Sequence, residues 1–257
     1  MSRVRSIQTR LLPHGPWDVM RQVLLFFVAY NGYRLVRGLA DEPGVTAAAF
    51  DHARHLIGVE RSLHVFVEPD VQSWATGTHF LADIASWLYI NAQTSVTLGA
   101  LAFLYLFHNR SFYFVRNMFM VAMGLALIGY TIYPTAPPRF LPEWGFQDSV
   151  SNLVGVTHDN GTVNALFNPY AAVPSMHSCF ALMIGIPLSR LVVNPIGKVF
   201  WAIYPLLVVF VIVATANHFL ADAFLGGCTA AVSAFAATWL ARARPAAWAF
   251  SPQGVTA

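Results

Sequence analysis

The sequence has few charged residues: Asp, Glu, Lys and Arg make up only 11% of its 257 residues. Soluble domains carry about a quarter. This scarcity, together with 56% hydrophobic residues and a mean hydropathy of +0.54, excludes an ordinary soluble domain. The composition predicts a membrane protein.

Linkers and internal repeats are also missing. No stretch rich in Gly, Ser and Pro separates two regions of different composition, and apolar runs recur along most of the chain. We therefore predict a single membrane-embedded domain over residues 1–257. The absence of repeated halves argues against a transporter built from them.

Cysteine is scarce, and the basic residues form no continuous face. Cys179 and Cys228 each lie within an apolar run, where a free thiol behaves as a small hydrophobic group, so disulfides are not predicted. The formal net charge is +3, but the basic residues lie at the ends of apolar runs. A nucleic-acid partner is therefore not predicted, and the sequence favours no particular oligomeric state.

Six apolar stretches are long enough to cross a bilayer core, which takes about 20 helical residues. They cover approximately residues 17–38, 80–107, 112–133, 175–193, 199–216 and 218–240. Between the first two, residues 39–79 mix charged and apolar positions, a pattern typical of short helices at a membrane surface. The predicted fold is an all-α bundle of six transmembrane helices, with interfacial helices in the first outer loop.

Lys and Arg are shared unevenly between the two sets of helix ends, and membrane proteins keep the richer set in the cytoplasm. The richer set contains Arg3, Arg5, Arg10, Arg21, Arg110, Arg116, Arg190, Lys198, Arg242 and Arg244. The poorer set contains Arg34, Arg37, Arg54, Arg61 and Arg139. Both termini are therefore expected in the cytoplasm, and the two long loops on the outer face.

Three polar clusters interrupt the apolar sequence, at Tyr133–Arg139, Pro174–His177 and His218–Asp222. The first closes the third predicted helix, the second opens the fourth, and the third opens the sixth. All three therefore lie at outward ends of helices. Residues distant in the sequence are expected to meet there at one membrane depth.

His218 and Asp222 are four residues apart, so on a helix their side chains share one face. The carboxylate can accept the proton of one imidazole nitrogen and leave the other nitrogen free to attack. A histidine satisfied near a helix start explains the pair equally well when it is taken alone. A carboxylate within an apolar run nevertheless needs a partner.

The other two clusters supply groups that suit a phosphate. Ser175 is placed to cap a helix whose free N–H groups attract an anion, and His177 in the first turn is placed to act as a general acid. Arg139 carries a planar guanidinium that fits phosphate oxygens. Singly, these residues are explained by a helix start and an interfacial arginine; together with the histidine pair they predict a site for phospho transfer.

These motifs resemble the signature of the type 2 phosphatidic acid phosphatase superfamily, a membrane family that works through a phosphohistidine. Its Pro-Ser-x-His element is present at Pro174–His177 and its His-x-x-x-Asp element at His218–Asp222, within a signature region of about residues 112–240. The run ending at Arg139, and residues 168–172, are similar to the branch that contains fungal inositol phosphorylceramide synthase.

The resemblance implies an integral-membrane enzyme that acts on a membrane lipid. It implies His218 as the nucleophile, Asp222 as the residue that orients it, and His177 as the general acid. Arg139 and Ser175 would bind the substrate phosphate. No metal ion and no organic cofactor are implied.

Two positions depart from the common phosphatase pattern, since Ile132 stands where that pattern has Lys and Ile212 where it has Arg. A phosphate monoester carries about −1.5 to −2 charges at neutral pH, whereas a diester carries a single negative charge. The one clear arginine fits a diester better. This favours a head-group phosphotransferase over a monoesterase, unless Arg34, Arg37 or His158 restores the missing charge.

The predicted reaction moves a phospho head group from a lipid phosphodiester to an alcohol acceptor. Two alternatives stay open: a lipid phosphate phosphatase, with water as the acceptor, and a non-catalytic transporter or scaffold. His52, His55 and His64 are given no metal-binding role, because a hydrated interfacial helix explains them. The polar stripe within residues 91–97 is given no catalytic role, because interhelical hydrogen bonding explains it.

Overall fold

The structure, a computed structural model, describes residues 15–38, 43–150 and 170–248. Within this part of the chain every regular element is a helix. The α-helices are α2 (Gly15–Gly38), α3 (Pro43–Ser62), α4 (Glu68–Thr76), α5 (His79–Phe107), α6 (Asn109–Ile132), α9 (Met176–Leu191), α10 (Pro195–Ala214), α11 (Leu220–Ala243) and α12 (Pro245–Trp248). Two 3-10 turns, η1 (Pro138–Phe140) and η2 (Pro142–Trp144), follow α6. The predicted all-α class is confirmed.

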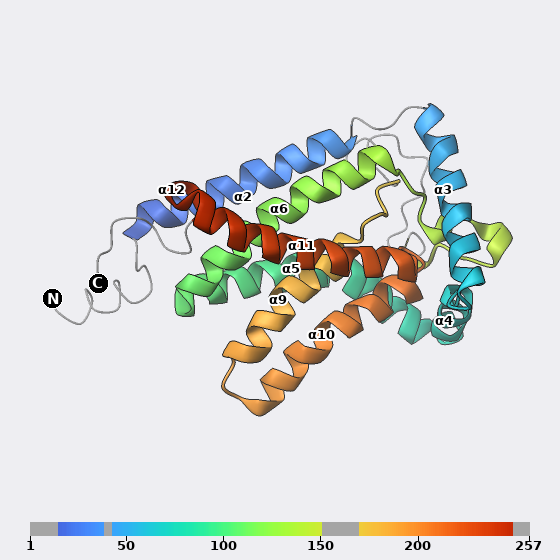
Figure 1. Cartoon of the computed structure of the whole chain (residues 1–257). Helices are drawn as coiled ribbons and strands as arrows, with labels where there is room; N and C mark the ends of the chain where they lie inside the picture. Colours follow the sequence, from blue (N-terminus) through green and yellow to red (C-terminus); the bar gives the residue numbers. More distant parts are fainter. Residues whose placement is uncertain (1–14, 39–42, 151–169, 249–257) are drawn as a thin grey trace.

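Six long helices form a bundle (Figure 1): α2, α5, α6, α9, α10 and α11 lie where the six apolar stretches predicted helices. Apolar side chains from α5, α6, α9 and α11 make up most of the main core. The outside of the bundle also carries large exposed apolar side chains, among them Phe80, Leu206 and Phe235. Such a surface is typical of helices that face lipid.

Four helices are long and apolar enough to cross a membrane: α5 from Phe80, α6, α10 and α11. Helix α9 has only 16 residues, fewer than the roughly 20 that a bilayer core requires. Helix α2 has 24 residues, but Asp18, Arg21 and Gln22 lower the hydropathy of its first turns. By length and composition, four of the described helices can therefore cross a membrane, and the count of six spans stays a prediction.

The polar residues of α2 are paired inside the bundle. Asp18 accepts hydrogen bonds from Gln22 Nε2 at 2.9 Å and Tyr105 Oη at 2.9 Å, and another from Tyr113 Oη. Arg116 Nη1 donates to Gln22 Oε1 at 3.1 Å. These bonds join α2 to α5 and α6, so protein groups rather than water satisfy the polar start of α2.

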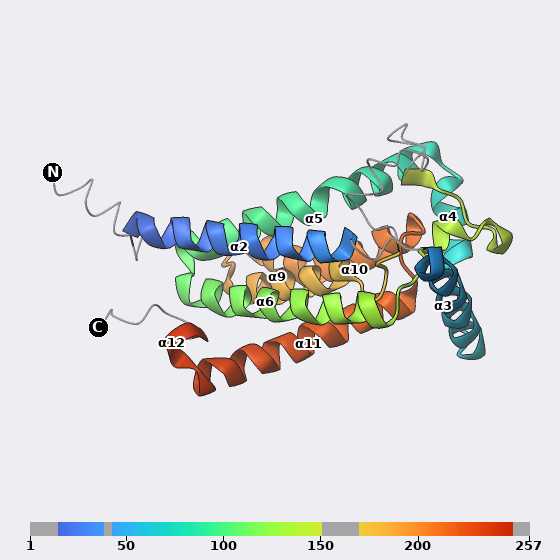
Figure 2. The same cartoon turned by 90° about the horizontal axis from the view of Figure 1, so that it is seen from above.

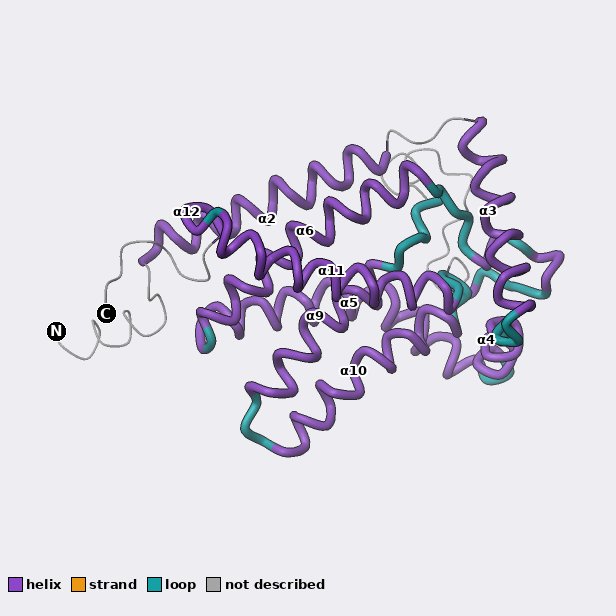
Figure 3. Tube along the Cα trace, in the orientation of Figure 1, coloured by secondary structure: helices purple, strands orange, loops and turns teal. Residues whose placement is uncertain are grey.

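Helices α3 and α4 form in the segment predicted to hold short helices, and they cross one end of the bundle (Figures 1 and 2). At this end α6 finishes at Ile132, α9 begins at Met176 and α11 begins at Leu220. The non-helical segments after α6 and before α9 gather there (Figure 3). A small apolar cluster that includes Ile57 and Phe219 packs α3 against them.

Two glycines allow the segment before α9 to pack closely against its neighbours. A Cβ at Gly226 of α11 would overlap Ser178 Oγ and the backbone oxygen of Ser175. A Cβ at Gly129 of α6 would lie 2.7 Å from Pro174 Cδ. The start of α9 is therefore held between α6 and α11 by positions that tolerate no side chain.

Candidate active site

The three predicted polar clusters meet at the end of the bundle that α3 and α4 cover. The N–H of Arg139 donates to the backbone oxygen of Ala216 at 2.8 Å, which ties the segment after α6 to the turn before α11. The N–H of Ser175 donates to the backbone oxygen of Asp222 at 3.1 Å, which ties the start of α9 to the same helix. Backbone hydrogen bonds thus join segments that are far apart in the sequence.

His218 and Asp222 form a buried pair, but not through the helical spacing that predicted it. Helix α11 begins at Leu220 with Phe219 as its N-cap, so His218 lies before the helix. Asp222 reaches back across the first turn, where its Oδ2 accepts the N–H of Phe219 at 2.9 Å and lies 3.3 Å from His218 Nδ1. Both residues are buried. The carboxylate contacts the ring at Nδ1, which leaves Nε2 as the second nitrogen.

The turn that carries His218 is held by its own side chains. Thr215 Oγ1 donates to the backbone oxygen of Val211 at 2.8 Å, and Asn217 Nδ2 donates to Thr215 Oγ1 at 2.8 Å. Ala216 has a φ of 50°, in the left-handed region that residues with a Cβ rarely adopt. A tight turn therefore separates the last two long helices, and it sets the backbone conformation before His218.

His177 lies in the first turn of α9, beside His218. The ring centroids are 5.4 Å apart in a T-shaped arrangement. The ring of Tyr89, from α5, stacks on His177 with a centroid distance of 4.6 Å. Tyr89 was not predicted as a site residue, because an aromatic side chain on an apolar helix belongs to no motif. Two imidazoles, one from α9 and one from the turn before α11, are thus in contact with each other.

Ser175 is the N-cap of α9, as its place in the sequence predicted. Its Oγ accepts the N–H of Ser178 at 3.5 Å, a long distance for this kind of bond, and the residue is fully buried. The positive end of the α9 dipole therefore lies next to His177. A role of Ser175 in phosphate binding stays a prediction.

Arg139 lies in η1, and its backbone bond to Ala216 places it beside the turn that carries His218. Its side chain is 15% exposed, with Nε 3.7 Å from Asp148 Oδ2 and Cζ 4.9 Å from the ring centre of Phe140. Asp148 therefore partly neutralises the guanidinium. Asp148 was not predicted as a site residue, because nothing in the sequence pairs it with Arg139.

Two acidic residues that the sequence analysis missed complete this end of the bundle. Glu60 of α3 accepts the N–H of Ala221 at 2.7 Å, and Glu68 of α4 accepts the N–H of Leu220 at 2.8 Å. Both residues are buried. Together with Asp222, three carboxylates cap three consecutive N–H groups at the positive end of α11.

A signal for Glu60 is present in the pattern of α3. Ala49, Ala53 and Ile57 are among the buried residues of this helix, and Glu60 follows them at helical spacing. An acid on the apolar face of an amphipathic helix points to a buried partner. Glu68 has no comparable signal, because it lies at the start of a short helix with another acid nearby.

Comparison with known proteins identifies the family. The family model described as PAP2 superfamily matches residues 54–237, which is more than half of the chain. The chain belongs to this superfamily. It is also similar to a phosphoinositol dihydroceramide synthase of Bacteroides thetaiotaomicron, with 24% identity over 245 residues that cover 86% of this chain and 73% of the relative. No solved structure matches the chain significantly.

Membership of the PAP2 superfamily makes the chain an enzyme of a membrane phosphotransferase and phosphatase family, as its motifs predicted. At the two positions where it departs from the common phosphatase pattern, Ile132 is 73% exposed at the end of α6 and Ile212 is fully buried in α10. Neither position supplies a cation. The side chains of Arg34 and Arg37, and the whole of His158, lie outside the described residues.

The histidines of α3 contact the segment after α6. His52 Nδ1 lies 2.7 Å from the backbone oxygen of Pro134, and His55 Nδ1 lies 2.9 Å from Tyr133 Oη. In the described part of the chain no group of three His, Cys, Asp or Glu side chains is placed to hold a metal ion. These two histidines are therefore explained by contacts that hold α3 over the site.

Proposed function

We propose that this member of the PAP2 superfamily transfers a phospho head group from a lipid phosphodiester to an alcohol acceptor, and that His218 carries the group between them. The observation that most supports this is the double contact of His218, with Asp222 Oδ2 at 3.3 Å and with the His177 ring at 5.4 Å. The Asp222 carboxylate is suited to activating the His218 imidazole as a nucleophile. The His177 imidazole is suited to donating and accepting a proton.

The reaction has two halves. In the first, His218 Nε2 bonds to phosphorus, the bond from phosphorus to the lipid alcohol oxygen breaks, and protonated His177 gives its proton to that oxygen. In the second, the acceptor hydroxyl gives its proton to His177, its oxygen bonds to phosphorus, and the bond from His218 to phosphorus breaks. His177 thus acts first as acid and then as base, and it is protonated again at the end of the cycle.

Phosphate binding is assigned to Arg139 and to the start of α9 behind Ser175. A guanidinium and the free N–H groups of a helix N-terminus both bind phosphate oxygens. Arg139 lies near the turn of His218, but Asp148 is 3.7 Å from its Nε. A bound phosphate therefore competes with Asp148 for the guanidinium.

A diester suits this site better than a monoester. Three carboxylates, Asp222, Glu60 and Glu68, lie around the start of α11, and Ile132 and Ile212 occupy the positions where the family pattern has cations. A monoester would bring about −1.5 to −2 charges into these surroundings, whereas a diester brings a single one. This supports transfer over monoester hydrolysis.

The relative indicates a class of donor and acceptor. That relative is named for the synthesis of a phosphoinositol dihydroceramide. For this chain we therefore propose a phosphoinositol lipid as the donor and a lipid with a free hydroxyl as the acceptor. In the first half-reaction the phosphoinositol group is then carried by His218.

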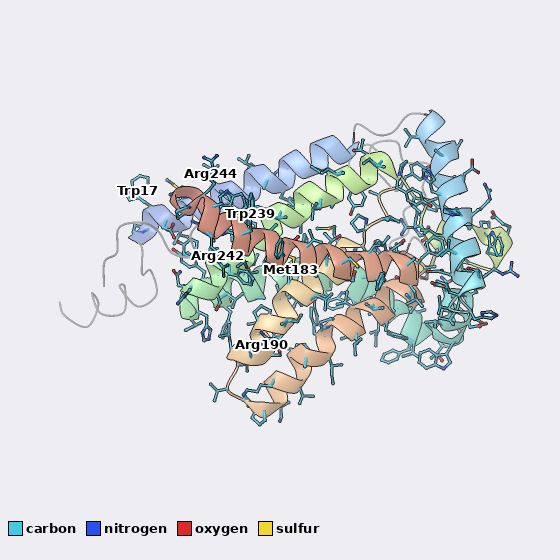
Figure 4. All side chains as sticks on the ribbon, in the orientation of Figure 1. Trp17, Met183, Arg190, Trp239, Arg242 and Arg244 are labelled. Carbon is cyan, nitrogen blue, oxygen red and sulfur yellow. The ribbon has the colours of Figure 1, made fainter. Side chains whose placement is uncertain are left out.

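The proposed arrangement in the membrane is one domain of six spans, with α3 and α4 at the outer surface above the site and both termini in the cytoplasm. Figure 4 shows Arg190, Arg242 and Arg244 in the half of the molecule away from α3 and α4, with Trp239 near them. Arginines are retained on the cytoplasmic side, and tryptophans favour the membrane interface. This distribution supports an outward-facing site.

Assays with purified protein test the proposed reaction. Phosphatidylinositol in mixed micelles, with and without a ceramide-type alcohol, is compared with phosphatidic acid as the monoester. We expect a new phosphoinositol lipid only when the alcohol is present, and little inorganic phosphate from phosphatidic acid. Rapid phosphate release from phosphatidic acid without transfer from the diester would establish the phosphatase alternative. Undiminished turnover by His218→Ala would contradict the proposed mechanism.

A further inference from the structure

Glu60 and Glu68 each have one oxygen in use and one oxygen buried without a partner. Oε1 of Glu60 and Oε1 of Glu68 accept backbone N–H groups of α11 at 2.7 Å and 2.8 Å. Oε2 of each side chain is buried and has no hydrogen-bond donor among the described residues. The two residues are 2% and 0% exposed, so bulk water does not reach these oxygens.

A proton shared between the two side chains would satisfy both free oxygens. Two neighbouring buried carboxylates do not both stay ionised, because burial and mutual repulsion favour protonation of one of them. Burial raises the pKa of Glu60 from 4.5 to about 8, against the opposing effect of the N–H of Ala221. The negative charges of Glu68 and Asp222 raise this pKa further. A hydrogen bond between two carboxyl groups requires one proton.

The charged groups around Glu60 come from α4, α11 and α3 itself. Helix α4 contributes Glu68, and α11 contributes Asp222, which is already paired with His218. On α3 the guanidinium of Arg61 lies over a tryptophan ring of η2, 5.5 Å from its centre. The groups that act on Glu60 through their charge are therefore acids.

Within the described part of the chain, neither an arginine nor a metal site balances the pair. In the segment after α6, Arg139 is paired with Asp148. Among the described residues, no ion pair includes Glu60 or Glu68, and no group of three metal-ligating side chains is placed to bind a metal ion. A proton is therefore the cation that fits between the two carboxylates.

We propose that Glu60 and Glu68 are positioning residues which share one proton and, in this state, hold the first turn of α11 so that His218 is aligned for attack. This inference rests on the proposed role of His218. Leu220 and Ala221, the residues that the pair caps, lie two and three positions after the nucleophile. When the shared proton is lost, three negative charges face one another at this turn, beside the site of an anionic substrate.

The direction of the pH effect follows from this protonation state. Loss of the shared proton is expected to lower activity as the pH rises through about 8, in addition to the loss that follows when His177 gives up the proton it needs as general acid. Stability changes in the same direction. Because the pKa of Glu60 in the folded protein lies above its ordinary value of 4.5, the folded state binds more protons, and its stability falls as the pH rises from 4.5 through about 8.

The test is a pH–rate profile of the full-length protein in phosphatidylinositol micelles with an acceptor alcohol, from about pH 6 to about pH 10. Glutamine resembles the protonated acid, because its oxygen accepts the helix N–H and its amide group donates to the other carboxylate. We expect E60Q and E68Q to lose at most about threefold in kcat below neutral pH and to show a smaller alkaline fall than the unmodified protein, because only the titration of His177 remains. E60A leaves the N–H of Ala221 without its acceptor and the Glu68 carboxylate without its neighbouring carboxyl group. We expect kcat of this variant to fall by about tenfold or more.

Glu143→Gln is the matched control, since Glu143 is exposed and its ion-pair partner among the described residues is the exposed Arg54 at 3.5 Å. This variant should keep the unmodified pH profile. An alkaline fall in E60Q equal to that of the unmodified protein overturns the inference, as does an E60Q that is as inactive as E60A at every pH. Loss of activity on chelation that E60Q does not show would indicate a metal ion in place of the proton, and would also overturn it.

A second measurement separates the failure of this inference from the failure of the proposed function. Thermal unfolding midpoints in detergent should fall between about pH 5 and about pH 8 for the unmodified protein and stay level for E60Q. Turnover by His218→Ala would contradict the proposed function, yet these midpoints would still test the shared proton. If the unfolding midpoint falls equally with pH in the unmodified protein and in E60Q, the shared proton is contradicted, even where transfer through His218 is established.

Discussion

At the scale of single residues, Asp222 combines two roles that a substitution can separate. Its Oδ2 caps the N–H of Phe219 and also contacts His218 Nδ1. In Asp222→Asn the amide oxygen can still accept the N–H of Phe219, but the neutral amide no longer stabilises a positively charged imidazole. We expect kcat for transfer to fall by about 10²- to 10⁴-fold, with the thermal unfolding midpoint little changed.

Kinetics of this variant are measured beside Asp83→Asn, which changes an exposed acid of α5. The control should keep the kcat of the unmodified protein. A loss in Asp222→Asn of less than about threefold would contradict the role assigned to the carboxylate. A large fall in its unfolding midpoint would show that the cap, rather than the imidazole, needs the charge.

Five site residues were predicted from the sequence because each belongs to a short motif, and the residue types in such a motif indicate its chemistry. Their meeting at one end of the bundle followed from the helix count. Tyr89, Glu60 and Glu68 belong to no motif, and only tertiary packing brings them to the motif residues. The predicted contact between His218 and Asp222 is present, but its structural cause differs from the predicted one. Asp222 contacts His218 through a helix cap and not along a helix face.

At the scale of elements, the contact of α9 with α11 depends on Gly226. A Cβ at this position would overlap Ser178 Oγ and the backbone oxygen of Ser175. We expect Gly226→Ala to destabilise the protein by about 1–3 kcal/mol through overpacking and to lower kcat, because the start of α9 carries His177. Thermal unfolding and transfer assays measure the two effects.

The adjacent Gly227 is the matched control, because a Cβ there would meet Leu182 Cδ1 at 3.5 Å, an ordinary contact. Gly227→Ala should leave activity in place and keep or raise stability, since alanine favours helix more than glycine does. Equal effects of the two substitutions would mean that the close approach of α9 and α11 does not position the site.

The long helices were predictable because an apolar run of sufficient length has few alternatives to helix in a membrane protein. Their bounds shifted where caps and turns act: Ser175 starts α9, and Asn194 caps α10 by accepting the N–H groups of Ile196 and Gly197. The docking of α3 and α4 on α11 was not predictable, because it rests on buried acids that hydropathy counts as polar surface.

At the scale of the whole molecule, the orientation in the membrane is open to a labelling test. Single cysteines at Glu143, in η2, and at Val193, in the turn between α9 and α10, mark opposite ends of the bundle. We expect a membrane-impermeant thiol reagent to label Glu143→Cys in intact cells and Val193→Cys only after lysis. The free Cys228 is exposed and is first replaced by alanine. The reverse pattern would invert the proposed topology.

The central claim, that His218 carries the phospho group, is tested most directly by trapping the intermediate. The protein is mixed with phosphatidylinositol labelled in its phosphate and no acceptor, quenched in alkali, in which phosphohistidine survives, and mapped by mass spectrometry. We predict label on His218, its loss when an acceptor alcohol is added before the quench, and none in His218→Ala. Label on another residue, or turnover without any labelled protein, would contradict the account.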